Sequence, residues 1–151
     1  MDMLLFSGSN SLDFTSRIAK KVNTEVSPAI ISKWPNGEIR VQYLCNLRRS
    51  HTVIVQTFEK DVNSELIELG IMIDAAKRAS ASEISVVVPY FPYSKQEKKF
   101  RGREAISARF IANMISSAGA SRVLTVDLHE GAIQGFFSIP VDHITTRKMV
   151  A

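Results

Sequence analysis

The stretch ISVVVPYFPYSKQEKKFRGR, residues 84–103, joins an uninterrupted apolar run to a strongly basic loop. The apolar run has the length and the β-branched composition of a buried strand. Prolines and aromatic side chains occupy the start of the loop, and the basic side chains that follow are Lys95, Lys98, Lys99, Arg101 and Arg103. A buried strand that ends in a rigid, cationic loop is typical of α/β proteins that bind a polyanionic ligand. The aromatic rings could stack on a base, and the cations could neutralise phosphates.

The rest of the chain alternates between strand-like and helix-like segments. Apolar runs predict strands over 3–6, 29–32, 39–43, 52–56, 84–88, 123–126 and 141–144. Apolar residues at helical spacing predict helices over 11–22, 63–79 and 106–118. A turn signal, Pro35-Asn36-Gly37, predicts that the second and third strands form a hairpin. The side chains that we expect to face inward are Leu12, Ile18 and Ala19 in the first helix and Leu66, Leu69, Ile73 and Ala76 in the second.

This alternation predicts an α/β sandwich with a mostly parallel central sheet. In such sheets, ligands bind beyond the carboxyl ends of the strands. The basic loop and the segment Asp127-Leu128-His129 both follow a predicted strand. We therefore expect both segments to lie at the ligand-binding edge of the sheet.

Composition and missing motifs exclude several classes of protein. The chain has 151 residues, of which 45% are hydrophobic and 23% charged, and a formal net charge of +4, which fits one globular domain. A single cysteine, Cys45, excludes an internal disulfide and a cysteine-rich zinc site. Walker A, GxGxxG, HExxH and GxSxG motifs are absent, so the chain is not a common kinase, dehydrogenase, zinc protease or hydrolase. The start does not resemble a signal peptide and no window resembles a membrane span, so we expect a cytoplasmic protein with no membrane partner.

Asp127-Leu128-His129 is a candidate metal site. Alternation along an extended backbone puts Asp127 and His129 on the same side of the chain. A carboxylate and an imidazole there could hold a divalent metal that phosphate oxygens also bind. The alternative is that Asp127 caps the following segment and His129 is a hydrogen-bonded histidine of the core.

Lys95-Gln96-Glu97-Lys98-Lys99 is a candidate phosphate site. Lysine suits phosphates as a mobile point charge, and Gln96 could read a base edge or a ribose hydroxyl. The alternative is a solvated run of charges. Ser107, at the start of the third predicted helix, could bond a ligand or cap the helix.

The hairpin turn Trp34-Pro35-Asn36-Gly37-Glu38 combines an aromatic ring with an amide and a carboxylate. These three groups could grip an adenine by stacking and by hydrogen bonds to its amino group. The alternative is a plain hairpin turn with an exposed tryptophan.

Several segments together resemble the ribose-phosphate pyrophosphokinases, also called phosphoribosyl pyrophosphate synthetases. The matching segments, in the same order and at the same spacing, are FSGSNS at 6–11, WPNGEIRVQ at 34–42, FPYSKQEKK at 91–99, ISARFIANMISSAGA at 106–120 and DLHEGAIQGFFSIPVD at 127–142. The resemblance implies a phosphoribosyltransferase-like three-layer α/β sandwich. It also implies magnesium-dependent transfer of the diphosphoryl group of ATP to ribose 5-phosphate, which yields 5-phosphoribosyl 1-pyrophosphate and AMP for nucleotide biosynthesis.

The resemblance also implies roles for individual residues. His129 and Lys95 would be catalytic, with His129 in the site of magnesium and the ATP phosphates, and Lys95 and Gln96 would contact ATP. An adenine pocket, donated by a neighbouring subunit of an oligomer, would comprise Trp34, Asn36 and Glu38. An allosteric phosphate and ADP site, also between subunits, would comprise Arg48, Ser80 and Gln134.

The chain departs from the family pattern in length and at several positions. Family members have a second domain that carries the ribose-phosphate site, so residues 1–151 resemble the single amino-terminal, ATP-side domain, and we expect this chain alone to be inactive. Lys95 stands where arginine is usual, and Glu104-Ala105 stands where Ala-Pro is usual. These changes favour an alternative in which the chain is a non-catalytic regulatory subunit of a synthetase complex. A nucleic-acid partner, which only the basic loop would support, is not expected.

Overall fold

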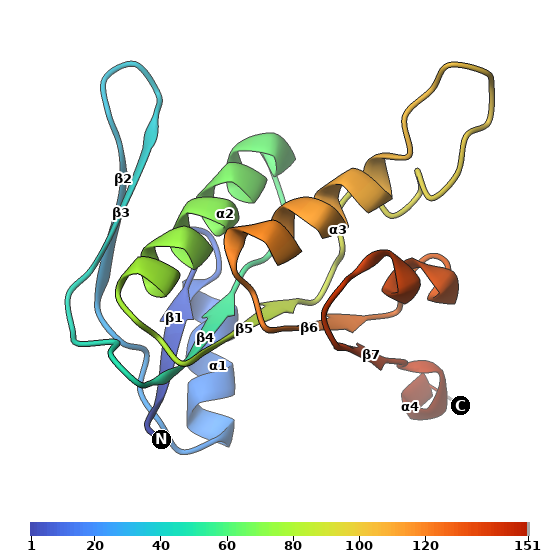
Figure 1. The fold of residues 1–151 in the computed structure, drawn as a ribbon. Helices are drawn as coiled ribbons and strands as arrows, with labels where there is room; N and C mark the ends of the chain where they lie inside the picture. Colours follow the sequence, from blue (N-terminus) through green and yellow to red (C-terminus); the bar gives the residue numbers. More distant parts are fainter. Residues whose placement is uncertain (151) are drawn as a thin grey trace.

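The fold is built on a central sheet of parallel strands, described for residues 1–150 by a computed structural model (Figure 1). The sheet has five strands in the order β1-β4-β5-β6-β7. In that order their bounds are Met3–Ser7, His51–Val55, Glu83–Val88, Arg122–Val126 and Val141–Ile144. All pairings between neighbouring strands are parallel, so their carboxyl ends share one edge of the sheet. The predicted parallel sheet is confirmed.

Helices cover both faces of the sheet and make three layers (Figure 1). The two long helices, α2 (Val62–Arg78) and α3 (Ser107–Ala118), pack on one face, and α1 (Leu12–Lys21) packs on the other. Adjacent strand residues separate the faces, because Phe6 packs with the α2 and α3 side whereas Leu5 packs with Ala19 of α1. None of the helices in residues 1–150 combines the length and apolar character that crossing a membrane demands.

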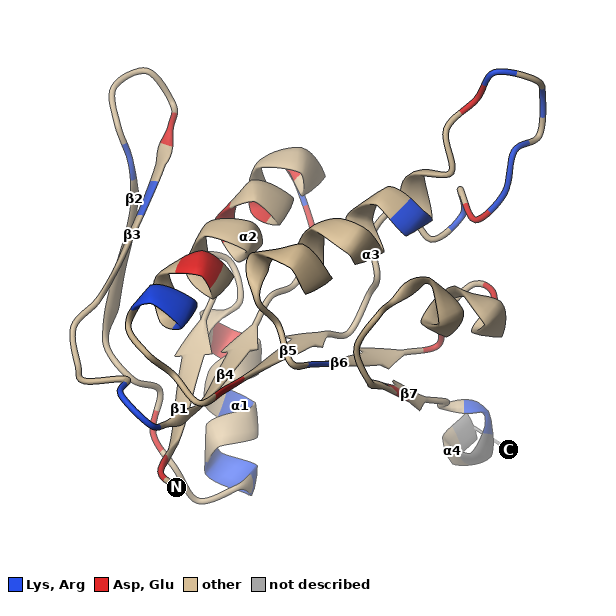
Figure 2. Ribbon diagram, viewed as in Figure 1, with Lys and Arg blue, Asp and Glu red and all other residues tan. Residues whose placement is uncertain are grey.

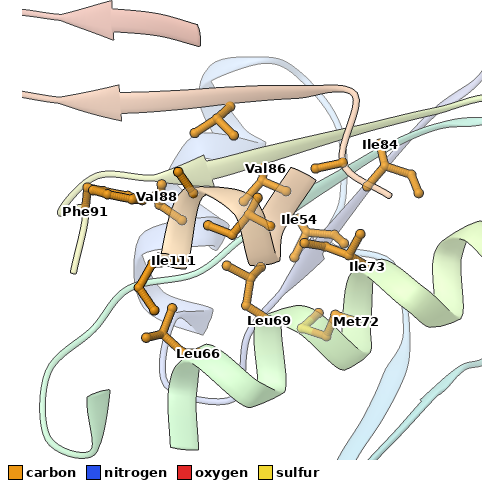
Figure 3. Close-up of a cluster of buried hydrophobic side chains, with 14 of the residues drawn as sticks. Ile54, Leu66, Leu69, Met72, Ile73, Ile84, Val86, Val88, Phe91 and Ile111 are labelled. Carbon is orange, nitrogen blue, oxygen red and sulfur yellow. The ribbon is translucent and has the colours of Figure 1, made fainter. Parts of the chain in front are cut away.

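The main hydrophobic core lies between the sheet and helices α2 and α3 (Figure 3). The α2 residues predicted to face inward, Leu66, Leu69, Ile73 and Ala76, are all buried in it. Strand residues of the same face, such as Ile54 and Val86, are fully buried beneath them. Helical spacing of apolar residues therefore identified the buried face of α2 correctly.

The prediction for the first helix is wrong at Leu12, whose side chain is 58% exposed. The buried positions of α1 are Thr15 and Ala19, which lie one turn apart. Thr15 fixes this orientation because its hydroxyl donates to the Ser11 carbonyl at 2.7 Å and to the Ser7 hydroxyl at 3.1 Å. Leu12 lies on the same side of α1 as Thr15 and Ala19, but it is the first residue of the helix and lines an open cavity with Gly8 and Val26, so its side chain meets solvent.

The predicted hairpin is confirmed and lies outside the central sheet (Figure 1). Strands β2 (Ala29–Lys33) and β3 (Ile39–Tyr43) pair antiparallel, and the turn between them projects from the body. Tyr43 anchors the base, because its hydroxyl donates to the Met72 carbonyl at 2.8 Å and its ring lies 4.4 Å from that of Phe6. Burial raises the pKa of the Tyr43 hydroxyl. Two short helices were not predicted, the 3₁₀ segment Gly131–Phe136 (η1) and α4 (Arg147–Val150).

Replacing Gly70 by alanine is expected to raise the free energy of unfolding by about 1 kcal/mol, because glycine costs conformational entropy inside a helix. A methyl group at Gly70 of α2 would meet no atom within 4 Å. Urea denaturation would measure the gain. Gly119→Ala is the matched control, because Gly119 has a φ of 128° and its added methyl would lie 2.8 Å from Lys77 Cδ, so this variant should lose stability. A destabilised Gly70→Ala variant would contradict the expectation.

Candidate functional site

Two loops meet at the carboxyl edge of the sheet, where β5 and β6 end side by side. The basic loop begins at Pro89, directly after β5, and the segment Asp127-Leu128-His129 begins directly after β6. The Val126 N–H donates to the Pro89 carbonyl at 3.1 Å, so the two loops are bonded where they begin. The sequence-based expectation that both segments share one edge is confirmed.

The basic loop closes on itself at its two ends. Ser107 Oγ donates to Gln96 Oε1 at 2.7 Å, and the Ala108 N–H donates to the Gln96 carbonyl at 3.1 Å. Within the loop, the Phe100 N–H donates to Glu104 Oε2 at 3.2 Å. Ser107 thus binds the loop and makes no cap hydrogen bond to α3. Figure 2 shows the loop projecting from the body with its cationic residues spread along it.

A cavity of about 500 Å³ opens beneath the start of the basic loop. Tyr93, whose φ is 62°, is one of its lining residues, and the Tyr93 hydroxyl donates to the Asn63 side-chain oxygen. The lining residues are Lys60, Asp61, Val62, Asn63, Tyr90, Tyr93, Lys95 and Gln96. The structure therefore brings Lys95 and Gln96 together in one concave site. Sequence reasoning missed Lys60 and Asn63, because no local pattern shows that the start of α2 faces this loop.

Asp127 holds the turn that follows β7. Its carboxylate accepts hydrogen bonds from the Thr146 N–H, at 2.9 Å, and from the Thr146 hydroxyl. These two bonds hold the pKa of the Asp127 carboxyl below its usual range. The Asp127 carboxylate therefore binds the turn after β7 and not the segment that directly follows it, so the capping role predicted from the sequence is not observed.

His129 lies in a separate cavity of about 730 Å³. The lining residues are Asp127, Leu128, His129, Glu130, Gly131, His143, Thr145, Thr146 and Arg147. The His129 side chain is exposed, so the alternative that His129 is a hydrogen-bonded histidine of the core is wrong. Residues 1–150 contain no group of three or more His, Cys, Asp or Glu side chains that could hold a metal ion. Magnesium commonly takes only one or two protein ligands and completes its shell with phosphate oxygens and water. His129 and the neighbouring Glu130 fit that limited role, whereas each oxygen of Asp127 already accepts a hydrogen bond from Thr146.

The hairpin residues lie apart from His129. Trp34 is 53% exposed, and the Arg40 guanidinium lies 5.8 Å from its ring centroid. Asn36 Oδ1 accepts the Glu38 N–H at 3.1 Å and so shapes the turn. Glu38 lines a cavity of about 470 Å³ against α2, and that cavity shares Asn63 with the cavity of the basic loop. Trp34 and Asn36 line neither cavity.

The residues implied for allosteric regulation divide between two places. Arg48 and Ser80 precede β4 and β5, at the amino edge of the sheet, and the neighbouring Arg49 N–H donates to the Ser80 carbonyl at 3.0 Å. Gln134 is exposed in η1, which packs against α3. A site built from all three residues would need more than one subunit and stays a prediction.

The Asp127 carboxyl should titrate below the usual value of about 3.9. Because its pKa is lowered in the folded chain, its contribution to stability is complete above the unfolded pKa and is lost as the pH falls through the folded pKa. Thr146→Val removes the hydroxyl donor and should raise the Asp127 pKa, whereas Thr145→Val should change it less. Carboxyl carbon shifts followed by NMR between pH 2 and about 6 would measure this. Equal effects of the two variants would contradict the assignment.

Comparison with known proteins gives one consistent family. Residues 3–119 match the model described as the N-terminal domain of ribose phosphate pyrophosphokinase. Ribose-phosphate pyrophosphokinase 1 of Streptococcus pneumoniae is 41% identical over 150 residues, which are 99% of this chain and 47% of that protein. Ribose-phosphate pyrophosphokinase 2 of Enterococcus faecalis is 44% identical over 147 residues, 97% of this chain and 46% of that protein.

A solved structure agrees with these relatives. The crystal structure of phosphoribosylpyrophosphate synthetase from Mycobacterium smegmatis superposes with a TM-score of 0.97 at 39% identity and covers 99% of this chain and 50% of that one. The chain thus spans about half the length of the relatives that it matches. On sequence and on fold, this chain belongs to the ribose-phosphate pyrophosphokinase family and corresponds to the N-terminal domain of those enzymes.

Proposed function

We propose that this chain is the ATP-binding half of a ribose-phosphate diphosphokinase. The complete enzyme transfers the diphosphoryl group of ATP to the 1-hydroxyl of ribose 5-phosphate and releases AMP and 5-phosphoribosyl 1-pyrophosphate. The observation that carries the proposal is the common edge at which Lys95, Gln96 and His129 emerge, from two loops bonded through Val126 and Pro89. Parallel α/β sheets bind their ligands at this edge.

The basic loop would bind the ATP phosphates. Lys95 supplies a mobile positive charge at the mouth of the cavity, and Gln96, ordered by Ser107, presents its amide beside it. Lysine cannot form the planar two-bond contact that arginine makes with phosphate, so this chain should bind ATP more weakly than relatives that carry arginine there. His129, with Glu130 beside it, would meet the magnesium ion that the ATP phosphates carry.

The hairpin would supply the adenine pocket to a neighbouring subunit. Trp34 offers an exposed ring, and its turn projects away from the body of its own chain (Figure 1). Asn36 and Glu38 lie on the same turn and would bond the adenine edge. The active protein would therefore be an oligomer, built from this chain alone or with other synthetase subunits.

ATP binding measured by calorimetry, with and without magnesium, tests the proposal. We expect magnesium-dependent binding that His129→Ala and Lys95→Ala each weaken about tenfold or more, because each removes an interaction with a charged group worth about 1.5–3 kcal/mol. Lys77→Ala is a matched control, because Lys77 lies in the last turn of α2, at the opposite edge of the sheet. ATP binding that is unaffected by both site variants would refute this assignment of the site.

The alternative function is a non-catalytic subunit that regulates longer synthetase subunits. Glu104 favours it, because it places a carboxylate within the basic loop. This alternative predicts no ATP binding by the chain alone, together with co-purification of a longer paralogue. In either case we expect no diphosphoryl transfer by the 151 residues alone, because the chain spans about half of its relatives. Measurable formation of 5-phosphoribosyl 1-pyrophosphate by the chain alone would overturn that expectation.

A further inference from the structure

The segment Asp127-Leu128-His129 is held almost entirely by β7 and the turn that follows it. The Asp127 N–H donates to the Ile144 carbonyl at 2.8 Å, and the Asp127 carboxylate accepts from Thr146. The Leu128 N–H donates to Nε2 of His143 at 3.0 Å. Three residues at the end of β7 and in the turn after it, His143, Ile144 and Thr146, therefore bond the two residues that precede His129.

The bond to His143 defines the state of the imidazole ring. A backbone N–H can only donate, so Nε2 must be the unprotonated nitrogen and Nδ1 carries the ring proton. His143 stands opposite Thr125 in the pairing of β7 with β6, so its ring rises beside the end of β6. The ring is half-buried and lines the same cavity as His129.

The backbone of this segment needs such support. Asp127 has a φ of 44°, a left-handed conformation that residues other than glycine seldom adopt. A residue other than glycine keeps a left-handed backbone conformation where hydrogen bonds from surrounding residues hold it there. The bonds to Ile144, His143 and Thr146 supply that constraint immediately before His129.

We propose that His143 is a positioning residue for His129. By accepting the Leu128 N–H, His143 fixes the direction in which the chain leaves Asp127 and so presents the next side chain, His129, to the cavity. The assignment of His129 to the magnesium–nucleotide site rests on the proposed function, whereas the clamp on Leu128 rests on the hydrogen bond alone. His143 contacts the loop and is not assigned to ligand binding.

Two substitutions of His143 distinguish the contribution of its hydrogen-bond acceptor from that of the size of its ring. His143→Leu keeps an apolar side chain but removes the acceptor, and His143→Gln offers a carbonyl oxygen that can reach the position of Nε2. The control is His51→Leu on β4, which removes a histidine bonded to Ser85 Oγ at 2.8 Å in the same sheet. Amide signals of β4 and β5 report whether each variant keeps the fold.

Amide hydrogen exchange and ring nitrogen shifts test the clamp without any ligand. In the wild-type chain, the ring nitrogens of His143 should show a protonated Nδ1 and an unprotonated, hydrogen-bonded Nε2. His143→Leu should speed exchange of the Leu128 amide by about tenfold, as expected for the loss of one net hydrogen bond. It should also lower the backbone order of His129 while the sheet amides stay protected. His143→Gln should restore both properties, and His51→Leu should change neither.

Titration with Mn²⁺ in the presence of ATP tests the consequence for the site. His143→Leu should weaken Mn²⁺ binding about tenfold, the effect usual for residues that orient a metal ligand, and His143→Gln should recover it. Unchanged Leu128 exchange and His129 order in His143→Leu would overturn the positioning role, and so would unchanged Mn²⁺ affinity in that variant. If the wild-type chain binds no Mn²⁺–ATP, the proposed function fails for the isolated chain, and the exchange data still decide the role of His143.

Discussion

Leu69→Ala is expected to lower the free energy of unfolding by about 3–4 kcal/mol. Leu69 is fully buried at the centre of the core that α2 and α3 form with the sheet (Figure 3). Truncating a buried leucine removes its transfer free energy and leaves a cavity that the neighbouring side chains fill only in part. Backbone helix propensity offsets very little of this loss, since alanine and leucine are both good helix formers. Urea denaturation followed by circular dichroism would measure the change.

Ile67→Ala is the matched control, because Ile67 lies on the same helix and its side chain is 52% exposed. Its removal should cost less than about 1 kcal/mol, since most of its surface already meets water. Similar losses in the two variants would show that the buried face of α2 has been misassigned.

Gly8→Ala is expected to destabilise the chain by about 2–3 kcal/mol, the range of overpacking in a closely packed region. The added methyl would lie 2.7 Å from Cδ of Gln56, a side chain that is fully buried. Gln56 cannot move freely, because its amide nitrogen donates to Asn10 Oδ1 and to the Thr57 carbonyl, both at 3.1 Å. The clash should therefore disturb the loops after β1 and β4 together. Thermal unfolding would measure the loss, and amide exchange at Thr57 would locate it.

Gly102→Ala serves as the control for the Gly8 variant, because its methyl would meet no atom within 4 Å. A second test adds Gln56→Ala to Gly8→Ala. The space made by the shorter side chain should relieve the clash, so the two losses should not add. Strict additivity would mean that Gln56 is not the neighbour that resists the methyl group.

Most of the fold follows from local patterns in the sequence. The β-branched run at 84–88 and the spacing of Leu66, Leu69 and Ile73 predict a strand and a helix whose observed bounds differ by about one residue. The order of the strands does not follow from such patterns. β1 pairs with β4, across the hairpin, and the hairpin packs against α2 instead of joining the sheet. Only the packing of distant segments determines that arrangement.

Buried polar residues are the part of the fold that periodicity misses. Glu65 and Glu68 of α2 are buried, although their residue type predicts exposure. Glu68 accepts hydrogen bonds from the backbone and the hydroxyl of Ser9, and Glu65 accepts from the side-chain amide of Asn10. Ser9 and Asn10 belong to the loop after β1, more than fifty positions away, so no local window contains these partners, although Glu65 also accepts from the nearby N–H groups of Glu59 and Lys60.

The candidate site divides in the same way. That Lys95 and His129 share one edge follows from parallel topology, which the sequence predicts. The contacts of His143 and Thr146 with the segment before His129 depend on the pairing of β7 with β6. The residue type of His143 does not predict that it bonds the segment before His129, because a histidine in a short strand can equally be an ordinary residue of the core. The roles of Trp34, Arg48, Ser80 and Gln134 depend on surfaces of other subunits and stay predictions.

The separation between the hairpin and the parallel sheet has a consequence for the order of folding. β2 and β3 are neighbours in sequence and can pair across a short turn. Each pair of strands in the central sheet is separated in sequence by a helix or by the hairpin, so these strands must close a longer loop before they can pair. The hairpin can therefore form within microseconds of chain collapse, while the sheet forms later, once distant segments have met. Pulse-labelled hydrogen exchange during refolding would separate the two events, with the amide of Ile30, which lies in a hydrogen-bonded pair of the hairpin, protected before that of Val86. Biosynthesis imposes the same order, because β7 leaves the ribosome after the other four strands and the sheet cannot be completed before β7 emerges.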